Sequence, residues 1–319
     1  MQKKSFWMLL FLLFLSSLYL AVGCSRGDSA GGSSGAATSE AKKSSGYPLT
    51  ITDDAGREVK FDSRPERIVS MAPSVTETLF AVGAGERIVG VTTADDYPPA
   101  VESIEEVGDY RGPNVEKVIS QNTDLMILSY DGTTKGYADD MQEKTGAKVV
   151  VINPKTVDEA ISSVGLVAKV VGEQERGRVV EERLRSELKR IEDAVAGEPE
   201  PTVFYEVWGD PLQTAGPGSF IDDAIGLARG KNIAADTGEA YPEYSKEVLL
   251  QKNPDYYLAA RSAGVTAEEI SQRPGYSALS AVEDGRVVVV NDDLIVRPGP
   301  RIVDGVGEIA EAIHPEVFD

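Results

Sequence analysis

Few side chains in this 319-residue sequence could do covalent chemistry, and their spacing does not assemble a catalytic site. The chain has one cysteine, Cys24, and one histidine, His314, which precedes a proline and is expected at the surface. Two carboxylate pairs, Asp95–Asp96 and Asp222–Asp223, are neighbours in sequence, so their side chains diverge on a helix or strand. No nucleophile is combined with a general base, and zinc or manganese capture lacks its usual imidazole and thiolate ligands. The sequence argues against an enzyme and against a transition-metal binder.

Large aromatic side chains suit a different task, which is the reversible binding of a broad apolar molecule. Four of them fall in loops directly after expected strands or before expected helices: Tyr110, Tyr130, Trp208 and Tyr241. In α/β proteins these loops border the crevice in which ligands bind. Tyr and Trp offer large flat faces at a small cost in rotamer freedom. The alternative for each is an aromatic that only anchors its own loop.

Two glutamates occupy equivalent places in two similar stretches of sequence. Glu116 lies in residues 114–128, and Glu247 lies in residues 245–258. In each stretch a helix-capping residue precedes the Glu by two positions, an Asp follows it by eight, and an apolar strand-like run comes next. A repeat at this separation predicts two lobes of similar construction. A cleft between two such lobes is a common place for a small ligand.

The elements that must position these residues alternate between strands and helices. The pattern predicts a hairpin over residues 47–61, strands over 67–71 and 88–92, and a helix from Ser74 to Val82 that opens with a Ser74-x-x-Glu77 capping box. This alternation implies a mainly parallel sheet that is covered by helices on both faces.

A long helical segment separates the two lobes. Apolar residues recur every three or four positions from Thr156 to about Ala196, and Gly172 marks a joint between two helices. The sequence therefore predicts an α/β protein with two similar βα lobes, joined by a long rigid helical connector, with a ligand cleft between the lobes. A stiff connector also predicts that the lobes open and close only slightly.

The N-terminus carries an export pattern. Lys3 and Lys4 precede an apolar run over residues 6–22, and small residues lead to Cys24. The run Ala21-Val22-Gly23-Cys24 resembles a bacterial lipobox, with Ala in place of the usual Leu. Cys24 is then the lipidated first residue of the mature protein, and the Ser- and Gly-rich run after it is a flexible tether. A single membrane-spanning anchor is the alternative.

The predicted domain boundaries follow from these features. In chain order they are a lipoprotein signal peptide over residues 1–23, the lipidated cysteine and tether over 24–46, a first lobe over 47–155, the connector over 156–197 and a second lobe over 198–319. The net charge of −20 argues against nucleic acid as a partner, because phosphate binding needs clustered Lys and Arg.

This order of parts resembles the substrate-binding lipoproteins of ABC importers. More narrowly, it resembles the helical-backbone class that carries siderophores, haem and vitamin B12, and within it most of all the cobalamin-binding proteins. The resemblance covers nearly all of residues 47–319 and is carried by four runs in register: residues 67–77, 90–99, 107–114 and 297–301.

The resemblance implies a transported ligand rather than a bound cofactor, and that ligand is a corrinoid. The four aromatics align with, or next to, ligand-contacting aromatics of the family. Asp293 and Arg297 match a carboxylate and a guanidinium that face corrin side-chain amides, although a surface ion pair is the alternative. One departure is Ala94, where the cobalamin binders commonly place a stacking Tyr.

The resemblance also implies partners. Glu116 and Glu247 match glutamates that seat in arginine pockets of the two permease subunits, although a Glu in a first helical turn also stabilises the helix dipole. The implied partners are the permease dimer with its ATPase subunits, and the membrane through the lipid anchor. We expect a monomer at the outer face of the cytoplasmic membrane.

An iron–siderophore or haem binder of the same fold is the main alternative. Anionic ferric siderophores usually draw several inward-facing arginines, which Arg111, Arg261 and Arg297 could supply. A purely structural or adhesive lipoprotein is a further alternative, and it predicts a cleft without recognition features.

Overall fold

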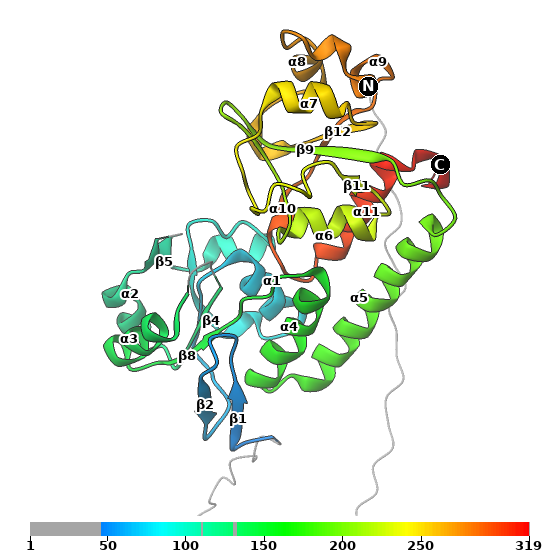
Figure 1. Cartoon of the computed structure of the whole chain (residues 1–319). Helices are drawn as coiled ribbons and strands as arrows, with labels where there is room; N and C mark the ends of the chain where they lie inside the picture. The colour runs from blue at the N-terminus through cyan, green and yellow to red at the C-terminus, as the bar shows by residue number, and fades with distance from the viewer. Residues whose placement is uncertain (1–45, 110, 130–132, 319) are drawn as a thin grey trace, which may run out of the picture. The chain divides into compact units, whose positions relative to one another are not determined.

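The computed structural model describes residues 46–109, 111–129 and 133–318. Cys24, the signal peptide and nearly all of the tether lie outside the described residues, as do Tyr110 and Tyr130. The rest of the chain forms two α/β lobes, each built on its own sheet (Figure 1).

The first lobe contains a six-stranded sheet in the order β6-β5-β4-β3-β7-β8, parallel except for β6. Its strands are β3 (Ile68–Ser70), β4 (Ile88–Thr92), β5 (Glu106–Asp109), β6 (Gly112–Pro113), β7 (Leu125–Leu128) and β8 (Lys148–Val151). Its helices are α1 (Pro73–Ala81), α2 (Val115–Ser120) and α3 (Lys135–Thr145). The predicted hairpin is confirmed as β1 (Leu49–Thr52) and β2 (Glu58–Phe61), which pair antiparallel.

The second lobe contains the parallel strands β9, β12 and β13, with β10 and β11 paired to β9. Their bounds are β9 (Thr202–Gly209), β10 (Leu212–Thr214), β11 (Lys231–Asn232), β12 (Tyr256–Ala260) and β13 (Val287–Val290). The helices are α6 (Phe220–Leu227), α7 (Lys246–Lys252), α8 (Ala267–Ser271), α9 (Ser280–Glu283), α10 (Asp293–Val296), α11 (Ile302–Ile313) and α12 (Pro315–Phe318). The predicted fold class, two α/β lobes with a helical connector, is confirmed.

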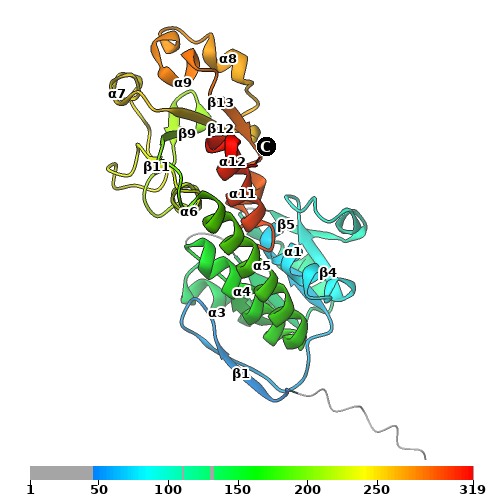
Figure 2. The same ribbon diagram turned by 90° about the vertical axis from the view of Figure 1, so that its right-hand side faces the viewer.

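The connector is a pair of packed helices, α4 (Val157–Val170) and α5 (Gln174–Val195). The predicted joint at Gly172 is confirmed, because this glycine has a φ of +73° that a residue with a side chain rarely adopts. The two helices run side by side (Figure 2). Only α5 runs from one lobe to the other, and its 22 residues give it a length of about 33 Å.

One hydrophobic core runs through both lobes. The same cluster of buried residues contains Leu79 of the first lobe, Val164 and Leu184 of the connector, and Ile225 and Val303 of the second lobe. Separating the lobes widely would expose this apolar surface to water. This shared core gives a physical reason for the prediction that the two lobes open only slightly.

The predicted capping box at the start of α1 is wrong. The helix begins at Pro73, its N-cap is Ala72, and no side chain caps it. Proline suits the first helical position, since its fixed φ fits the helix and its missing N–H is not needed there. Ser74 and Glu77 are instead buried, which leaves the Glu77 carboxylate available for a distant partner.

The sequence repeat is also a structural repeat. The predicted caps are confirmed, because the Asn114 side chain accepts a hydrogen bond from the Lys117 amide at the start of α2, and Ser245 does the same for Val248 at the start of α7. Both helices are followed by an asparagine with positive φ, at positions 122 and 253. The two helices are therefore begun and ended in the same way.

The aspartate of each repeat fastens the first central strand of its lobe. Asp124 accepts hydrogen bonds from the amides of Glu66 and Arg67, just before β3, at 2.8 and 3.0 Å. Asp255 accepts from the amide and the hydroxyl of Thr202, at the start of β9, at 2.8 and 2.6 Å. The repeat thus encodes a helix and the anchor for the neighbouring strand.

We predict that Asp255→Ala lowers the free energy of unfolding by about 2 kcal/mol at pH 7, because two hydrogen bonds to a charged group are lost. The hydrogen bonds from Thr202 lower the pKa of the Asp255 carboxyl. The contribution of Asp255 to the free energy of unfolding is therefore complete above its unfolded-state pKa of about 4. It is lost as the pH falls through the lower folded-state pKa. Denaturant titrations of both proteins at pH 7 and pH 3 measure the difference in the free energy of unfolding.

Asp193→Ala is the control. It removes an exposed ion pair on α5 and should change the free energy of unfolding by less than about 0.5 kcal/mol. An Asp255→Ala defect that persists in full at pH 3 would contradict the prediction.

Candidate functional site

A pocket of about 220 Å³ lies between the two lobes and is here called the interlobe pocket. Its residues from the first lobe follow strands β3, β7 and β8: Ala72, Pro73, Ser74, Ser129, Asn153 and Pro154. Its residues from the second lobe are Phe220, Tyr241, Val296, Arg297 and Pro298. Because β3, β7 and β8 are parallel neighbours, the residues that follow them gather at one edge of the sheet. Ligands of open α/β sheets bind at such an edge.

The wall of the interlobe pocket is mostly uncharged. The first lobe supplies two serine hydroxyls and one amide, from Ser74, Ser129 and Asn153. The second lobe supplies the aromatic rings of Phe220 and Tyr241, and Tyr241 is 45% exposed. This combination suits an apolar ligand with hydrogen-bonding groups on its edge.

The structure brings the two predicted residues Asp293 and Arg297 together. Arg297 Nη2 lies 2.9 Å from Asp293 Oδ1 in the same lobe. Arg297 also donates to both carboxylate oxygens of Asp96 in the first lobe, at 2.5 and 3.2 Å. The Arg297 side chain is only 15% exposed, so its charge is held between these carboxylates. The sequence did not indicate Asp96 as a site residue.

A second ion pair, between Arg301 and Glu77, also joins the two lobes. Arg301 donates to both carboxylate oxygens of Glu77, from Nε at 2.8 Å and from Nη2 at 2.5 Å. The Glu77 side chain is 2% exposed. The Arg301 guanidinium also lies over the Tyr97 ring, 4.3 Å from its centroid. We call Glu77, Asp96, Asp293, Arg297 and Arg301 the interlobe ion-pair cluster.

The cluster depends on a close approach of backbone to backbone. A Cβ atom on Gly299, between the two arginines, would lie 3.0 Å from the Ser74 carbonyl oxygen in α1. Glycine therefore lets the turn after α10 touch the start of α1. In the sequence, the run Arg297-Pro-Gly-Pro-Arg301 indicates this turn, because proline and glycine favour turns and an arginine flanks them on each side.

The sequential carboxylate pairs point apart, as predicted. Asp95 accepts hydrogen bonds from the amide and hydroxyl of Thr92, whereas Asp96 faces Arg297. In the second pair, one carboxylate accepts from Asn232 and the other accepts from the Val157 amide at the start of α4, at 2.7 Å. All four carboxylates have structural partners.

Trp208 lies at the end of strand β9 rather than in a loop. Its indole N–H donates to the Asp210 carbonyl at 3.0 Å, and 49% of the residue is exposed. It does not line the interlobe pocket. Its exposed ring stays available for a ligand larger than that pocket.

The other two candidate arginines have carboxylate partners. Arg111 lies 2.7 Å from Asp109, and Arg261 lies 3.8 Å from Glu308. Neither lines the interlobe pocket.

The predicted docking residues are exposed on equivalent helices. Glu116 lies in the first turn of α2, and Glu247 lies in the first turn of α7. The Ser245 hydroxyl donates to Glu247 at 2.7 Å and lowers the pKa of this carboxyl. Each helix also exposes an aliphatic side chain, Ile119 on α2 and Val248 on α7.

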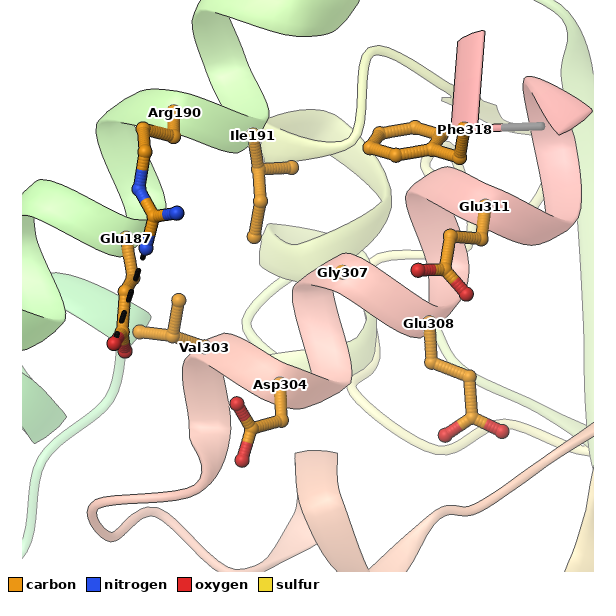
Figure 3. Close-up of a pocket in the computed structure, with 9 residues that line it drawn as sticks. All are labelled: Glu187, Arg190, Ile191, Val303, Asp304, Gly307, Glu308, Glu311 and Phe318. Carbon is orange, nitrogen blue, oxygen red and sulfur yellow. Dashed lines mark ion pairs between the residues drawn. The ribbon is translucent and has the colours of Figure 1, made fainter. Parts of the chain in front are cut away.

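A larger groove of about 750 Å³ lies between α5 and the C-terminal helices α11 and α12 (Figure 3). No strand residue lines it, and its polar rim is mostly acidic: Glu187, Asp304, Glu308 and Glu311. Burial raises the pKa of the Asp304 carboxyl. The groove lacks the aromatic and neutral polar wall of the interlobe pocket, apart from Phe318 at one end.

The expectation that His314 lies at the surface is wrong. The residue is 1% exposed, and its Nε2 atom lies 3.1 Å from the Ala228 carbonyl oxygen. It is a structural link between the end of α11 and the end of α6.

No helix in the described part of the chain has both the length and the apolar character that crossing a bilayer requires.

Comparisons with known proteins agree with this geometry. Residues 68–294 match the family described as periplasmic binding protein. The uncharacterized ABC transporter substrate-binding lipoprotein YvrC of Bacillus subtilis is 34% identical over 87% of this chain and 89% of its own. The crystal structure of the periplasmic vitamin B12 binding protein BtuF of Vibrio cholerae has a TM-score of 0.71 at 28% identity, covering 79% of this chain and 97% of that one. The haem-binding protein RhuT of Roseiflexus sp. RS-1 has a TM-score of 0.70 at 25% identity, covering 79% and 99%.

We predict that Glu77→Ala destabilises the protein by about 3 kcal/mol, because it leaves the half-buried Arg301 without its carboxylate. The double variant Glu77→Leu/Arg301→Met should regain most of this loss, since apolar side chains can replace a buried ion pair. Thermal and denaturant unfolding of the three proteins measure the effect. If the double variant is as unstable as the single one, the ion pair is not the cause.

Proposed function

The chain belongs to the periplasmic binding protein family, whose members are substrate-binding parts of transporters rather than enzymes, and on that premise we propose that its ligand is a corrinoid. The chain is an ABC-importer binding protein of the vitamin B12, siderophore and haem class. In our proposal it captures a vitamin B12-like molecule outside the cytoplasm and delivers it to the importer.

The charge balance of the interlobe pocket is the observation that favours a corrinoid. Arg297 is the one charged side chain among the described residues that line the pocket, and two carboxylates neutralise it. What remains is aromatic and neutral polar surface. A corrin ring is apolar on its faces and carries neutral amides on its edge, so this wall complements it.

The same pocket wall fits an anionic ligand less well. A ferric siderophore or the propionates of haem need unpaired cations, because burying an uncompensated charge is costly. The three candidate arginines, Arg111, Arg261 and Arg297, each have a carboxylate partner. The similarity to a haem-binding protein keeps haem as the second candidate.

The size of the pocket indicates how the ligand would sit. A corrin with its side chains is much larger than about 220 Å³, so only one edge enters the interlobe pocket. For the remainder we propose contacts with the exposed rings of Tyr241 and Trp208 in the second lobe. Tyr110 and Tyr130, which lie outside the described residues, stay the predicted ligand contacts of the first lobe. Asp293 and Arg297 would meet amides of the ring edge.

The exported location and the transport partners complete the proposal. Cys24 carries the lipid that holds the protein at the outer face of the cytoplasmic membrane, and the tether after it lets the lobes reach the permease. Glu116 and Glu247 dock on the two permease subunits, one from each lobe. The similarity to a substrate-binding lipoprotein supports both parts.

We predict that cyanocobalamin binds to the purified protein, and that Trp208→Ala and Tyr241→Ala each weaken binding by about 1–3 kcal/mol, the range for losing an interface aromatic. Titration calorimetry with cyanocobalamin, haem and a ferric siderophore measures this. Phe318→Ala is the matched control, because its ring lies in the α5–α11 groove. Tight binding of haem or the siderophore with no binding of cyanocobalamin would overturn the proposed ligand.

We predict that reversing both docking charges, Glu116→Lys with Glu247→Lys, abolishes uptake of the ligand but leaves its affinity unchanged, because neither residue lines the pocket. Uptake by cells that produce the importer and calorimetry on the purified variant measure the two effects. Glu143→Lys with Glu283→Lys reverses one exposed charge in each lobe elsewhere and serves as the control. Loss of affinity in the docking variant would place these residues in the binding site or the fold.

A further inference from the structure

Three carboxylates surround the guanidinium of Arg297. Asp96 takes two of its hydrogen bonds, Asp293 lies at 2.9 Å, and Glu77 lies 3.9 Å away. Arg297 also lines the interlobe pocket. These contacts use three of the five N–H donors of the guanidinium, so a ligand that takes the two donors now held by Asp96 must displace that carboxylate.

Two of the three carboxylates are poorly placed to leave. Glu77 is buried and already holds Arg301 through both oxygens. Asp293 is four residues from Arg297 in the same short helix region, so it moves with the arginine. Asp96 belongs to the other lobe, and its side chain is 63% exposed. Water can solvate Asp96 once it is released, which makes its pairing the least costly of the three to break.

Asp96 is nevertheless held next to Arg297, which lines the pocket. Its neighbour Asp95 accepts hydrogen bonds from the amide and hydroxyl of Thr92, which closes the turn after β4. The next residue, Tyr97, lies against Arg301 of the second lobe. The hydrogen bonds from Arg297 lower the pKa of the Asp96 carboxyl, so it is charged at neutral pH. An aspartate without partners is also charged at neutral pH, so a released Asp96 keeps a negative charge beside the ligand.

We propose that Asp96 is a specificity-determining residue, which neutralises the pocket-lining Arg297 from the first lobe and so excludes anionic ligands while yielding to a neutral one. A neutral amide carbonyl displaces Asp96 at the small cost of an exposed ion pair. An anionic group would gain the same arginine but would meet the Asp96 charge at close range. Discrimination thus comes from repelling the wrong ligand as well as from contacts to the right one. This inference rests on the proposed function.

The test compares Asp96→Asn with the wild-type protein by calorimetry, with cyanocobalamin as the neutral ligand and a ferric catecholate siderophore as the anionic one. The substitution keeps the shape of the side chain and removes its charge. We expect cyanocobalamin to bind about two- to fivefold more tightly, which is the strength of an exposed ion pair. We expect a gain of about tenfold or more for the siderophore, since a like charge is removed.

Two further measurements separate this role from a structural one. Both gains should shrink in 1 M salt, because salt screens the repulsion of the siderophore and also weakens the ion pair that cyanocobalamin has to break. Asp140→Asn removes the same charge from an exposed pair with Lys144 in the first lobe and should change neither affinity. A residue that merely supports the fold would weaken binding when replaced.

The outcomes are distinct from those of the proposed function. If Asp96→Asn leaves the ratio of the two affinities unchanged, or weakens the binding of cyanocobalamin, the inference is overturned. If the wild-type protein binds the siderophore and not cyanocobalamin, the proposed ligand fails. In that case an increase in siderophore affinity in Asp96→Asn would still support the role of Asp96, and no increase would refute it.

Discussion

The ion pair between Glu77 in one lobe and Arg301 in the other sets the distance at which the two lobes face each other. Two hydrogen bonds of fixed geometry join the carboxylate to the guanidinium, and the carboxylate is withdrawn from water. A buried pair of this kind contributes little net stability, because desolvation offsets the attraction, but it tolerates few other arrangements of its partners. Together with the hydrophobic core that runs through both lobes, it fixes the width of the interlobe pocket before a ligand arrives. A preformed pocket spares the ligand the cost of ordering its own site.

The repeat explains why both lobes can contribute to one site. Each lobe fastens a central strand with an aspartate, Asp124 or Asp255, that lies eight residues after an exposed glutamate on a short helix. The starts of β3 and β9 are therefore held in the same way, and the loops after the strands are free to differ. In this chain the first lobe presents hydroxyl and amide groups to the pocket, and the second presents rings and the arginine turn. The same scaffold thus supports two complementary walls.

Local signals in the sequence were sufficient for the fold, and they failed where distant residues decide the structure. The helix caps at Asn114 and Ser245 and the joint at Gly172 depend on interactions within a few residues, so their patterns could be interpreted directly. Glu77 and Arg301 are 224 positions apart, and Asp96 and Arg297 are 201 apart, and no spacing rule connects such positions. The capping-box prediction failed for a local reason, since α1 starts at Pro73 with Ala72 as its N-cap, which moves Glu77 out of the capping position.

The net charge of the chain and the charge balance of the interlobe pocket both disfavour anionic ligands. A net charge of −20 repels anions at long range, and salt screens that repulsion over about 10 Å at 0.1 M. Close to the pocket, carboxylates from both lobes surround Arg297 and remove the local attraction that could overcome the repulsion. A neutral amphipathic ligand is indifferent to the long-range field and gains apolar burial and hydrogen bonds in the pocket. If the proposed ligand is correct, its selection follows from a charge distribution that repels anions and a pocket wall that fits flat neutral surfaces, and neither requires the lobes to close far around it.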